Sequence, residues 1–214
     1  MTLEEFPRMS SVVLLHRNSQ VGARLAQAIA AAPGLEVTGV AQGFPALREL
    51  FAQALPDVLV VDLMLPPAHV KALLRDLRGN ARDGGPRILV LAVSADDPRV
   101  MDALRDGADG YYAQADAPLS LAETIDQLLR GESTMTPQIA RQVKSHFDAL
   151  ARSAAERLPE ADQRLLQWTS EGFLVAEVAR ALQISIASVG VRMHELYRRL
   201  QRDLRQPRLT LSAA

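Results

Sequence analysis

Five short apolar runs, each followed by an amphipathic stretch of helical periodicity, occupy the first 130 residues of the chain. The pattern predicts strands at residues 12–15, 37–41, 58–62, 88–93 and 110–112, and helices at 19–32, 44–54, 70–77, 98–106 and 120–130. The strands are continuously apolar rather than alternating, which is typical of a parallel sheet covered on both faces. We therefore predict an α/β fold, a doubly wound five-stranded parallel sheet.

In sheets of this kind, ligand chemistry lies at the carboxyl ends of the strands. Five residues occupy those ends and are the candidate site of this part of the chain: His16, Arg17, Asp62, Ala92 and Gln114.

The strand–helix alternation stops after residue 130, where a short polar stretch follows. Residues 137–152 predict a linker helix with Ile139, Val143, Phe147 and Leu150 along one side. Three further helices are predicted at 160–170, 175–182 and 186 to about 205. We accordingly divide the chain into a sheet domain (10–131), a linker helix (132–156) and a small all-α helix-turn-helix domain (157–206).

Charge differs between the two parts of the chain. Residues 1–130 carry 12 Arg or Lys and 16 Asp or Glu, whereas residues 131–214 carry 12 and 9. The basic stretch from 180 to 208 favours a polyanionic partner, or it is a solvated Arg-rich helix. Cysteine is absent, no apolar run is long enough to cross a bilayer, and the amino-terminal residues are acidic rather than basic. We expect a cytoplasmic protein without a membrane partner.

The segments PDVLVVDLMLPP (56–67), ILVLAVSADD (88–97) and LRDGADGYY (104–112) resemble the receiver domain of two-component response regulators. Their order and spacing match that family along residues 12–130. Residues 158–200 resemble the LuxR-type helix-turn-helix of the NarL/FixJ response regulators, which follows the receiver in the same order. The helical stretch is also similar to region four of sigma factors, but the preceding receiver favours the first assignment.

The resemblance implies a phosphoacceptor at Asp62, while the residues around that position depart from the family pattern. Receivers carry an acidic pair for Mg²⁺ where this chain has His16 and Arg17, a hydroxyl residue where it has Ala92, and a lysine where it has Gln114. The only lysines are Lys71 and Lys144. We predict a pseudo-receiver that takes up no phosphate, with an ion pair between Arg17 and Asp62.

Tyr111 stands where receivers carry an aromatic side chain that turns inward on activation. It is either an ordinary half-buried aromatic residue or held inward permanently above Ala92. His16 has no second His or Cys at ligand spacing, so no metal site is expected. No nucleophile–base pair or phosphate loop is present, so we expect neither an enzyme nor a cofactor.

In a helix-turn-helix the third helix enters the major groove. Ser185 is the expected N-cap of that helix, and Val189, Met193, Leu196 and Leu200 its inward face. His194 and Glu195 are then expected on the outward face. The residues expected to contact DNA are Ser185, Ala187, Ser188, Val191, Arg192, Arg198 and Arg199. Gly190 inside the helix costs about 1 kcal/mol relative to alanine. Because the outward face offers few groups that read bases and the arginines lie towards the far end of the helix, strong sequence specificity is not expected.

Two functions remain open at this point. The first is a transcriptional regulator that binds double-stranded DNA as a homodimer and works without phosphorylation. The second is a protein-interaction module, such as an anti-activator, whose two domains bind a regulatory protein partner. The arginines of the third helix favour DNA, and the neutral surface at Ala187 and Val191 favours a protein.

Overall fold

In the computed structural model, which describes residues 9–80, 85–117, 119–152 and 157–205, the first domain is a five-stranded parallel sheet. Its strands are β1 (Ser10–Leu15), β2 (Leu35–Ala41), β3 (Val58–Asp62), β4 (Arg87–Ala92) and β5 (Gly110–Ala113). The strand order is β2-β1-β3-β4-β5, and every neighbouring pair is parallel. The predicted fold class is confirmed.

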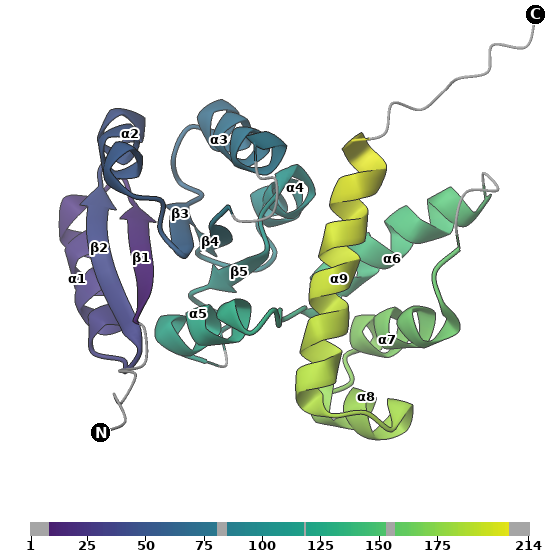
Figure 1. The fold of residues 1–214 in the computed structure, drawn as a ribbon. Helices are drawn as coiled ribbons and strands as arrows, with labels where there is room; N and C mark the ends of the chain where they lie inside the picture. Colours follow the sequence, from purple (N-terminus) through teal and green to yellow (C-terminus); the bar gives the residue numbers. More distant parts are fainter. Residues whose placement is uncertain (1–8, 81–84, 118, 153–156, 206–214) are drawn as a thin grey trace, which may run out of the picture.

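Five helices cover the sheet (Figure 1): α1 (Ser19–Ala30), α2 (Phe44–Gln53), α3 (Pro67–Asn80), α4 (Pro98–Asp106) and α5 (Leu121–Leu129). One face of the sheet packs against α1 and α5 through Val12, Leu14, Val60 and Leu89. The other face packs against α2, α3 and α4. Because both faces are covered, the inner strands β3 and β4 are buried along nearly their whole length, as the sequence pattern indicated, whereas the edge strand β2 alternates between buried and exposed residues.

The element boundaries agree with the predictions to within a few residues, and the largest difference lies at α3. That helix begins at Pro67 rather than Val70 and continues to Asn80 rather than ending at Leu77. The Pro66–Pro67 pair had been assigned to a loop. Proline is well tolerated in the first turn of a helix, where its missing N–H leaves no hydrogen bond unmade, so Pro67 opens the helix.

The second domain consists of α6 (Pro137–Arg152), α7 (Glu160–Glu171), α8 (Val175–Leu182) and α9 (Ile186–Arg205). Ile139, Val143 and Phe147 are buried, and α6 packs along α7. The helix that the sequence marked as a linker is thus part of the helical domain's core. A left-handed Gly172 (φ +94°) ends α7 at the predicted break.

The long α9 lies between the two domains (Figure 1) and contacts α4 of the first domain as well as α7 and α8 of its own. Val189, Met193, Leu196 and Leu200 are at most 1% exposed and form the predicted inward face. One apolar cluster runs from β3 and α4 through Tyr111 to α9. The two domains therefore share a continuous core. Within the described ranges, no helix is long and apolar enough to span a membrane.

Candidate functional site: the carboxyl edge of the sheet and helix α9

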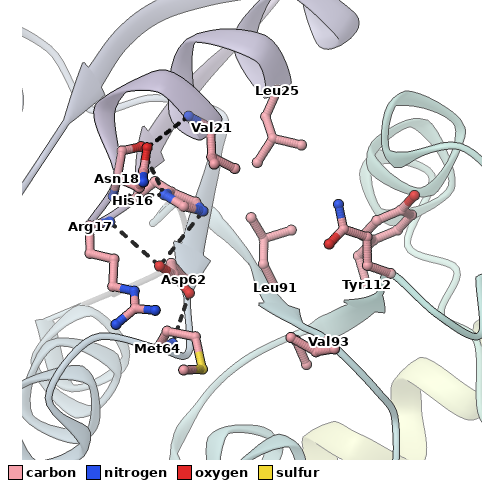
Figure 2. A pocket seen from close by; sticks show the side chains of 12 residues that line it. His16, Arg17, Asn18, Val21, Leu25, Asp62, Met64, Leu91, Val93 and Tyr112 are labelled. Atoms are coloured by element: carbon pink, nitrogen blue, oxygen red, sulfur yellow. Dashed lines mark hydrogen bonds and ion pairs between the residues drawn. The ribbon is translucent and has the colours of Figure 1, made fainter.

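Five predicted residues meet at the carboxyl edge of the sheet, because parallel strands all end on the same side. His16 and Arg17 follow β1, Asp62 ends β3, Ala92 ends β4 and Gln114 follows β5. All five line one pocket, which Figure 2 shows from close by. The strand assignments therefore placed these five residues at the edge where the fold brings them together.

Asp62 is 4% exposed and lies at the bottom of this site. Its Oδ1 accepts a hydrogen bond of 2.8 Å from the backbone N–H of Met64. Its Oδ2 has two longer contacts, the backbone N–H of Arg17 at 3.5 Å and Nε2 of His16 at 3.7 Å. One carboxylate oxygen is thus firmly bonded, and the other is only loosely held.

The predicted ion pair between Arg17 and Asp62 is wrong. Arg17 reaches Asp62 only through its backbone N–H, while its side chain is exposed. In Figure 2 the dashed lines from Asp62 lead to His16, to the backbone of Arg17 and to Met64. The ring that approaches the carboxylate belongs to His16. A side chain at the end of a strand can turn towards the site or towards water, and sequence spacing does not distinguish the two directions.

Asn18 explains the orientation of the His16 ring. The Nδ1 atom of His16 accepts from the backbone N–H of Asn18 at 3.1 Å, and the Oδ1 atom of Asn18 accepts from the N–H groups of Gln20 and Val21. Asn18 is thereby the N-cap of α1. The cap leaves Nε2 of His16 directed at Asp62.

Among the described residues that line the pocket, no Ser, Thr or Lys takes the hydroxyl or lysine position of a receiver. Ala92 carries no polar atom in its side chain, and the hydroxyl of Ser94 donates to Asp116 at 2.9 Å rather than pointing into the site. Gln114 is exposed. In the described ranges, no group of three or more His, Asp or Glu side chains could hold a metal ion.

Arg99 is a residue of this edge that sequence reasoning missed. It lies in the first turn of α4, pairs with Asp97 at 2.6 Å, and donates to the backbone oxygen of Leu63 at 2.9 Å. The hydrogen bonds from Arg99 lower the pKa of the Asp97 carboxyl. In the sequence Arg99 is a single arginine after Pro98, and nothing local indicated that it reaches the loop after β3.

Tyr111 points inward, as one of the two interpretations held. It is 4% exposed, and its hydroxyl accepts a 2.9 Å hydrogen bond from the backbone N–H of Thr136, the residue before α6. Burial raises the pKa of the Tyr111 hydroxyl. The side chain thus connects the last strand of the sheet to the start of the helical domain.

In the helical domain, α7, α8 and α9 form a helix-turn-helix in which α9 is the third helix. The hydroxyl of Ser185 accepts from the N–H of Ser188 at 3.0 Å, which makes it the cap that the sequence predicted. Ala187 and Val191 are exposed and Ser188 is half-buried. These residues present a small, largely uncharged surface at the start of α9.

The predicted DNA-contacting arginines have different surroundings. Arg192 forms a 2.8 Å ion pair with Asp162 of α7, which is largely buried. Arg198 is about half exposed and Arg199 is half-buried. Arg192 thus binds two helices of its own domain together, whereas Arg198 extends towards the first domain.

One face of α9 is docked against the first domain. The backbone oxygen of Gly190 accepts from Ser133 at 3.0 Å, and the Tyr197 hydroxyl donates to the Thr134 oxygen at 2.8 Å. Further along, Nε2 of Gln201 donates to the backbone oxygens of Leu104 and Ala108. The three positions are seven and four residues apart, close to two turns and one turn of a helix, so they follow a single face of α9.

Close packing explains why a glycine occupies position 190 inside α9, which the sequence did not reveal. A Cβ atom at this position would lie 3.0 Å from Cβ of Glu132. The absence of a side chain lets the backbone of α9 approach the segment after α5 closely. The lower helix propensity of glycine at this position is offset by that approach.

Several charged side chains surround Asp109, which is completely buried at the interface between the two domains. Its Oδ2 accepts from Arg78 and from the backbone N–H of Ile88. Its Oδ1 has no hydrogen-bond partner among the described residues, and lies 3.6 Å from Arg198 and 4.0 Å from His194. Burial lowers the pKa of Arg78, although Asp109 partly opposes that shift.

The placement of His194 corrects the sequence prediction, which put it on the outward face of α9. It is outward with respect to its own domain, but the first domain covers it and leaves it 7% exposed. Its Nδ1 lies 3.1 Å from the Ser133 hydroxyl and its Nε2 lies 3.5 Å from Arg87. Burial lowers the pKa of His194, Asp109 raises it, and Arg87 and Arg198 lower it further.

Comparisons with known proteins find relatives along nearly the whole chain. The nitrate/nitrite response regulator NarL of Escherichia coli is 26% identical over 196 residues, which cover 90% of this chain and 89% of that protein. The DNA-binding transcriptional activator DevR/DosR of Mycobacterium tuberculosis is 28% identical over 177 residues, covering 80% and 79%. No family model matches the chain.

Solved structures share the fold. The response regulator RcsB of Salmonella typhimurium superposes with a TM-score of 0.53 at 18% identity, covering 92% of this chain and 98% of that one. The receiver domain of a response regulator named NarL from Mycobacterium tuberculosis superposes with a TM-score of 0.51 at 21% identity, covering 58% and 99%. The receiver fold and the helical domain after it are thus found together in this order.

Proposed function

We propose that the chain is a DNA-binding transcriptional regulator of the NarL/FixJ response-regulator type, with a receiver followed by a LuxR-type helix-turn-helix, and that its receiver works without phosphorylation of Asp62. Proteins of this family are transcription regulators rather than enzymes. The observation that carries the proposal is the pair formed by an intact helix-turn-helix and a receiver pocket without its phosphate-binding groups.

DNA binding is supported by the composition and placement of α9. The helix is long, follows α8 through a tight turn that ends with a left-handed Gln183, and carries a cap at Ser185. The third helix of such a motif enters the major groove with its first residues at the base edges. Here those residues are small and uncharged, while Arg198 and Arg199 lie further along, where phosphates are within reach.

Phosphorylation independence is supported by the contents of the receiver pocket. Phosphoryl transfer to a carboxylate requires a metal ion and fixed positive charge to neutralise the incoming oxygens. Among the described residues that line this pocket, Asp62 is the only carboxylate, and a single carboxylate is a poor site for Mg²⁺. The pocket thus lacks the groups that receivers use for this reaction.

The docked position of α9 limits the access of this helix to DNA. The major groove is about 12 Å wide and admits one helix with its side chains. In this conformation the receiver lies against Gly190, His194 and Tyr197, so it occupies space next to the reading surface. DNA binding therefore requires α9 to leave the receiver, and the docked conformation is the resting form.

A second function is favoured by a separate observation. Phe173, Leu174, Ile186 and Val191, which lie around α8 and the start of α9, are between 38% and 69% exposed. Apolar side chains at these positions suit a protein partner better than a phosphate backbone. The chain would then be an anti-activator or adaptor.

Salt dependence distinguishes the two functions. Phosphate contacts release counterions, so duplex binding should weaken steeply and linearly in log–log form as salt rises. We expect this from a titration with labelled duplexes of the protein's own promoter region and of unrelated sequence. Absence of binding to any duplex at low salt would refute the DNA proposal and leave the protein-interaction function.

We also propose that the regulator acts as a homodimer in the cytoplasm, where the DNA is. The apolar face of α6 packs against α7, so we expect the dimer contact to come from the receiver rather than from α6. Light scattering on the purified protein, with and without duplex, measures the oligomeric state.

A further inference from the structure

The pocket at the carboxyl edge of the sheet has the size of a small-molecule site. Its volume is about 400 Å³, and pockets for drug-sized ligands measure about 300–1,000 Å³. It extends from Asp62 across β4 to the side of α1. It thus continues beyond the space that a phosphoryl group on Asp62 would occupy.

One side of the pocket is apolar. Val21 and Leu25 come from successive turns of α1, and Leu91 and Tyr112 are neighbours on β4 and β5. Figure 2 shows these four side chains around one space, with Val93 below them. Val93 is 63% exposed and Met64 is 39% exposed, so apolar surface is left in contact with water at the mouth. Such surface is stabilised when an apolar ligand covers it.

The opposite side is polar and centres on Asp62. The Oδ2 atom of Asp62 has contacts of 3.5 Å and 3.7 Å, both longer than an ordinary hydrogen bond. A buried carboxylate oxygen in that situation has room for one short hydrogen bond from a ligand. A ligand with an N–H or O–H group at one end would supply it.

Charge selects further among ligands. Asp62 and the exposed Arg17 line the pocket with opposite charges, so its wall favours neither an anion nor a cation. We propose that this pocket binds an uncharged, ring-containing apolar molecule that carries one hydrogen-bond donor, such as an aromatic amine or a phenol. The donor bonds Asp62, and the rings lie between α1 and the ends of β4 and β5.

The pocket is adjacent to the junction between the domains. Tyr112 lines the pocket, and the preceding residue, Tyr111, faces the other side of the sheet and accepts the hydrogen bond from Thr136 before α6. A ligand against Tyr112 therefore touches the strand that holds the helical domain. The proposal rests on the proposed function in one respect, namely that no phosphoryl group occupies Asp62.

The test is a titration of the full-length protein with N-phenyl-1-naphthylamine, an uncharged probe with aromatic rings and one N–H. We expect a saturable rise in probe fluorescence with one site per chain, and shifts of the amide signals of β4, β5 and α1 in NMR spectra. Replacing Val93 with arginine, V93R, fills the mouth with a side chain at an already exposed position. It should weaken probe binding by about tenfold or more.

Two more variants locate the probe. Asp62→Leu removes the acceptor and should weaken binding several-fold, whereas Leu55→Glu changes an exposed apolar residue before β3, at the other edge of the sheet, and should leave binding unchanged. The proposal is overturned if no saturable binding occurs, or if V93R binds the probe as the unmodified protein does. The titration contains neither Mg²⁺ nor a phosphate donor, so it is independent of whether Asp62 can be phosphorylated or α9 binds DNA.

Discussion

Asp109 of the receiver and Arg198 of α9 face each other across the domain interface, with Oδ1 of the carboxylate 3.6 Å from Nη1 of the guanidinium. The carboxylate is completely buried, and this oxygen has no hydrogen bond among the described residues. The same arginine is one of the residues proposed to contact DNA phosphates. If Arg198 contacts DNA phosphates as proposed, the first domain and DNA compete for this side chain.

Separating the domains should strengthen DNA binding. Gly190→Leu places a side chain where a Cβ atom alone would lie 3.0 Å from Glu132, while leucine is a better helix former than glycine. The docked form should be lost and the helix-turn-helix kept. We expect duplex affinity to rise by about 5- to 150-fold, the usual range of coupling between two sites.

Small-angle scattering should show the Gly190→Leu protein as more extended than the unmodified one. The matched control is Ala181→Leu, which adds the same side chain at an exposed position of α8. If the Gly190→Leu protein keeps both its compact shape and its duplex affinity, the docked form does not restrict DNA binding.

Docking should also weaken in mild acid. Burial lowers the pKa of His194 in the docked form, where Asp109, Arg87 and Arg198 face it. When the domains separate, the imidazole returns to its ordinary pKa of about 6.5. The docked form therefore binds fewer protons than the separated form. The contribution of neutral His194 to docking is fully present above about pH 6.5 and is lost as the pH falls from there through the lowered pKa.

The measurement is a scattering or fluorescence-transfer titration of the domain separation from pH 7.5 down to about pH 5.5. His194→Gln removes the titrating group and should flatten the profile over that range. An unchanged slope in His194→Gln would assign the pH dependence to other groups.

The part of the site that the sequence predicted follows from topology. Parallel strands end at one edge, so His16, Asp62, Ala92 and Gln114 could be brought together from strand assignments alone. The side chain that approaches Asp62 could not be predicted in this way, because the choice between His16 and Arg17 depends on how Asn18 caps α1. Rotamers of that kind are decided by contacts that a sequence pattern does not contain.

Sequence periodicity could not predict the docked face of α9, for a different reason. Apolar spacing identifies the side of a helix that faces its own domain, which is why Met193 and Leu196 were assigned correctly. His194 and Gln201 are polar and are buried by the other domain, through hydrogen bonds to Ser133 and to backbone oxygens. A polar residue buried across an interface looks like a surface residue in the sequence.

Phosphorylation of Asp62 should not occur. Incubation with acetyl phosphate and Mg²⁺ should leave the protein mass unchanged, because the acidic pair, the hydroxyl and the lysine of a receiver are replaced. The positive control is the combined variant His16→Asp, Arg17→Asp, Ala92→Thr and Gln114→Lys, which restores those groups. A stable single phosphate on the unmodified protein, mapped to Asp62, would contradict phosphorylation independence.

Arg192 should matter for stability. Its ion pair with Asp162 at 2.8 Å compensates a carboxylate that is 8% exposed. Arg192→Ala leaves that group without its charged partner, which costs about 1–3 kcal/mol for a buried polar group. Denaturant unfolding measures the loss, with the exposed Arg180→Ala as the matched control. If the two variants are equally stable, the ion pair with Asp162 contributes little to stability, and Arg192 is then available to contact bases.

Arg198 and Arg199 should contribute phosphate contacts rather than base contacts, because they lie well past the start of α9. We expect Arg198→Ala and Arg199→Ala to weaken binding to every duplex alike and to flatten the salt slope by about one unit each. Since Arg198 also pairs with Asp109, the measurement belongs in the Gly190→Leu background, where the domains are already apart. Arg24→Ala, at an exposed position of α1, is the control and should change nothing. A loss of about 1–3 kcal/mol confined to one preferred sequence would instead mean that the replaced arginine binds a guanine edge.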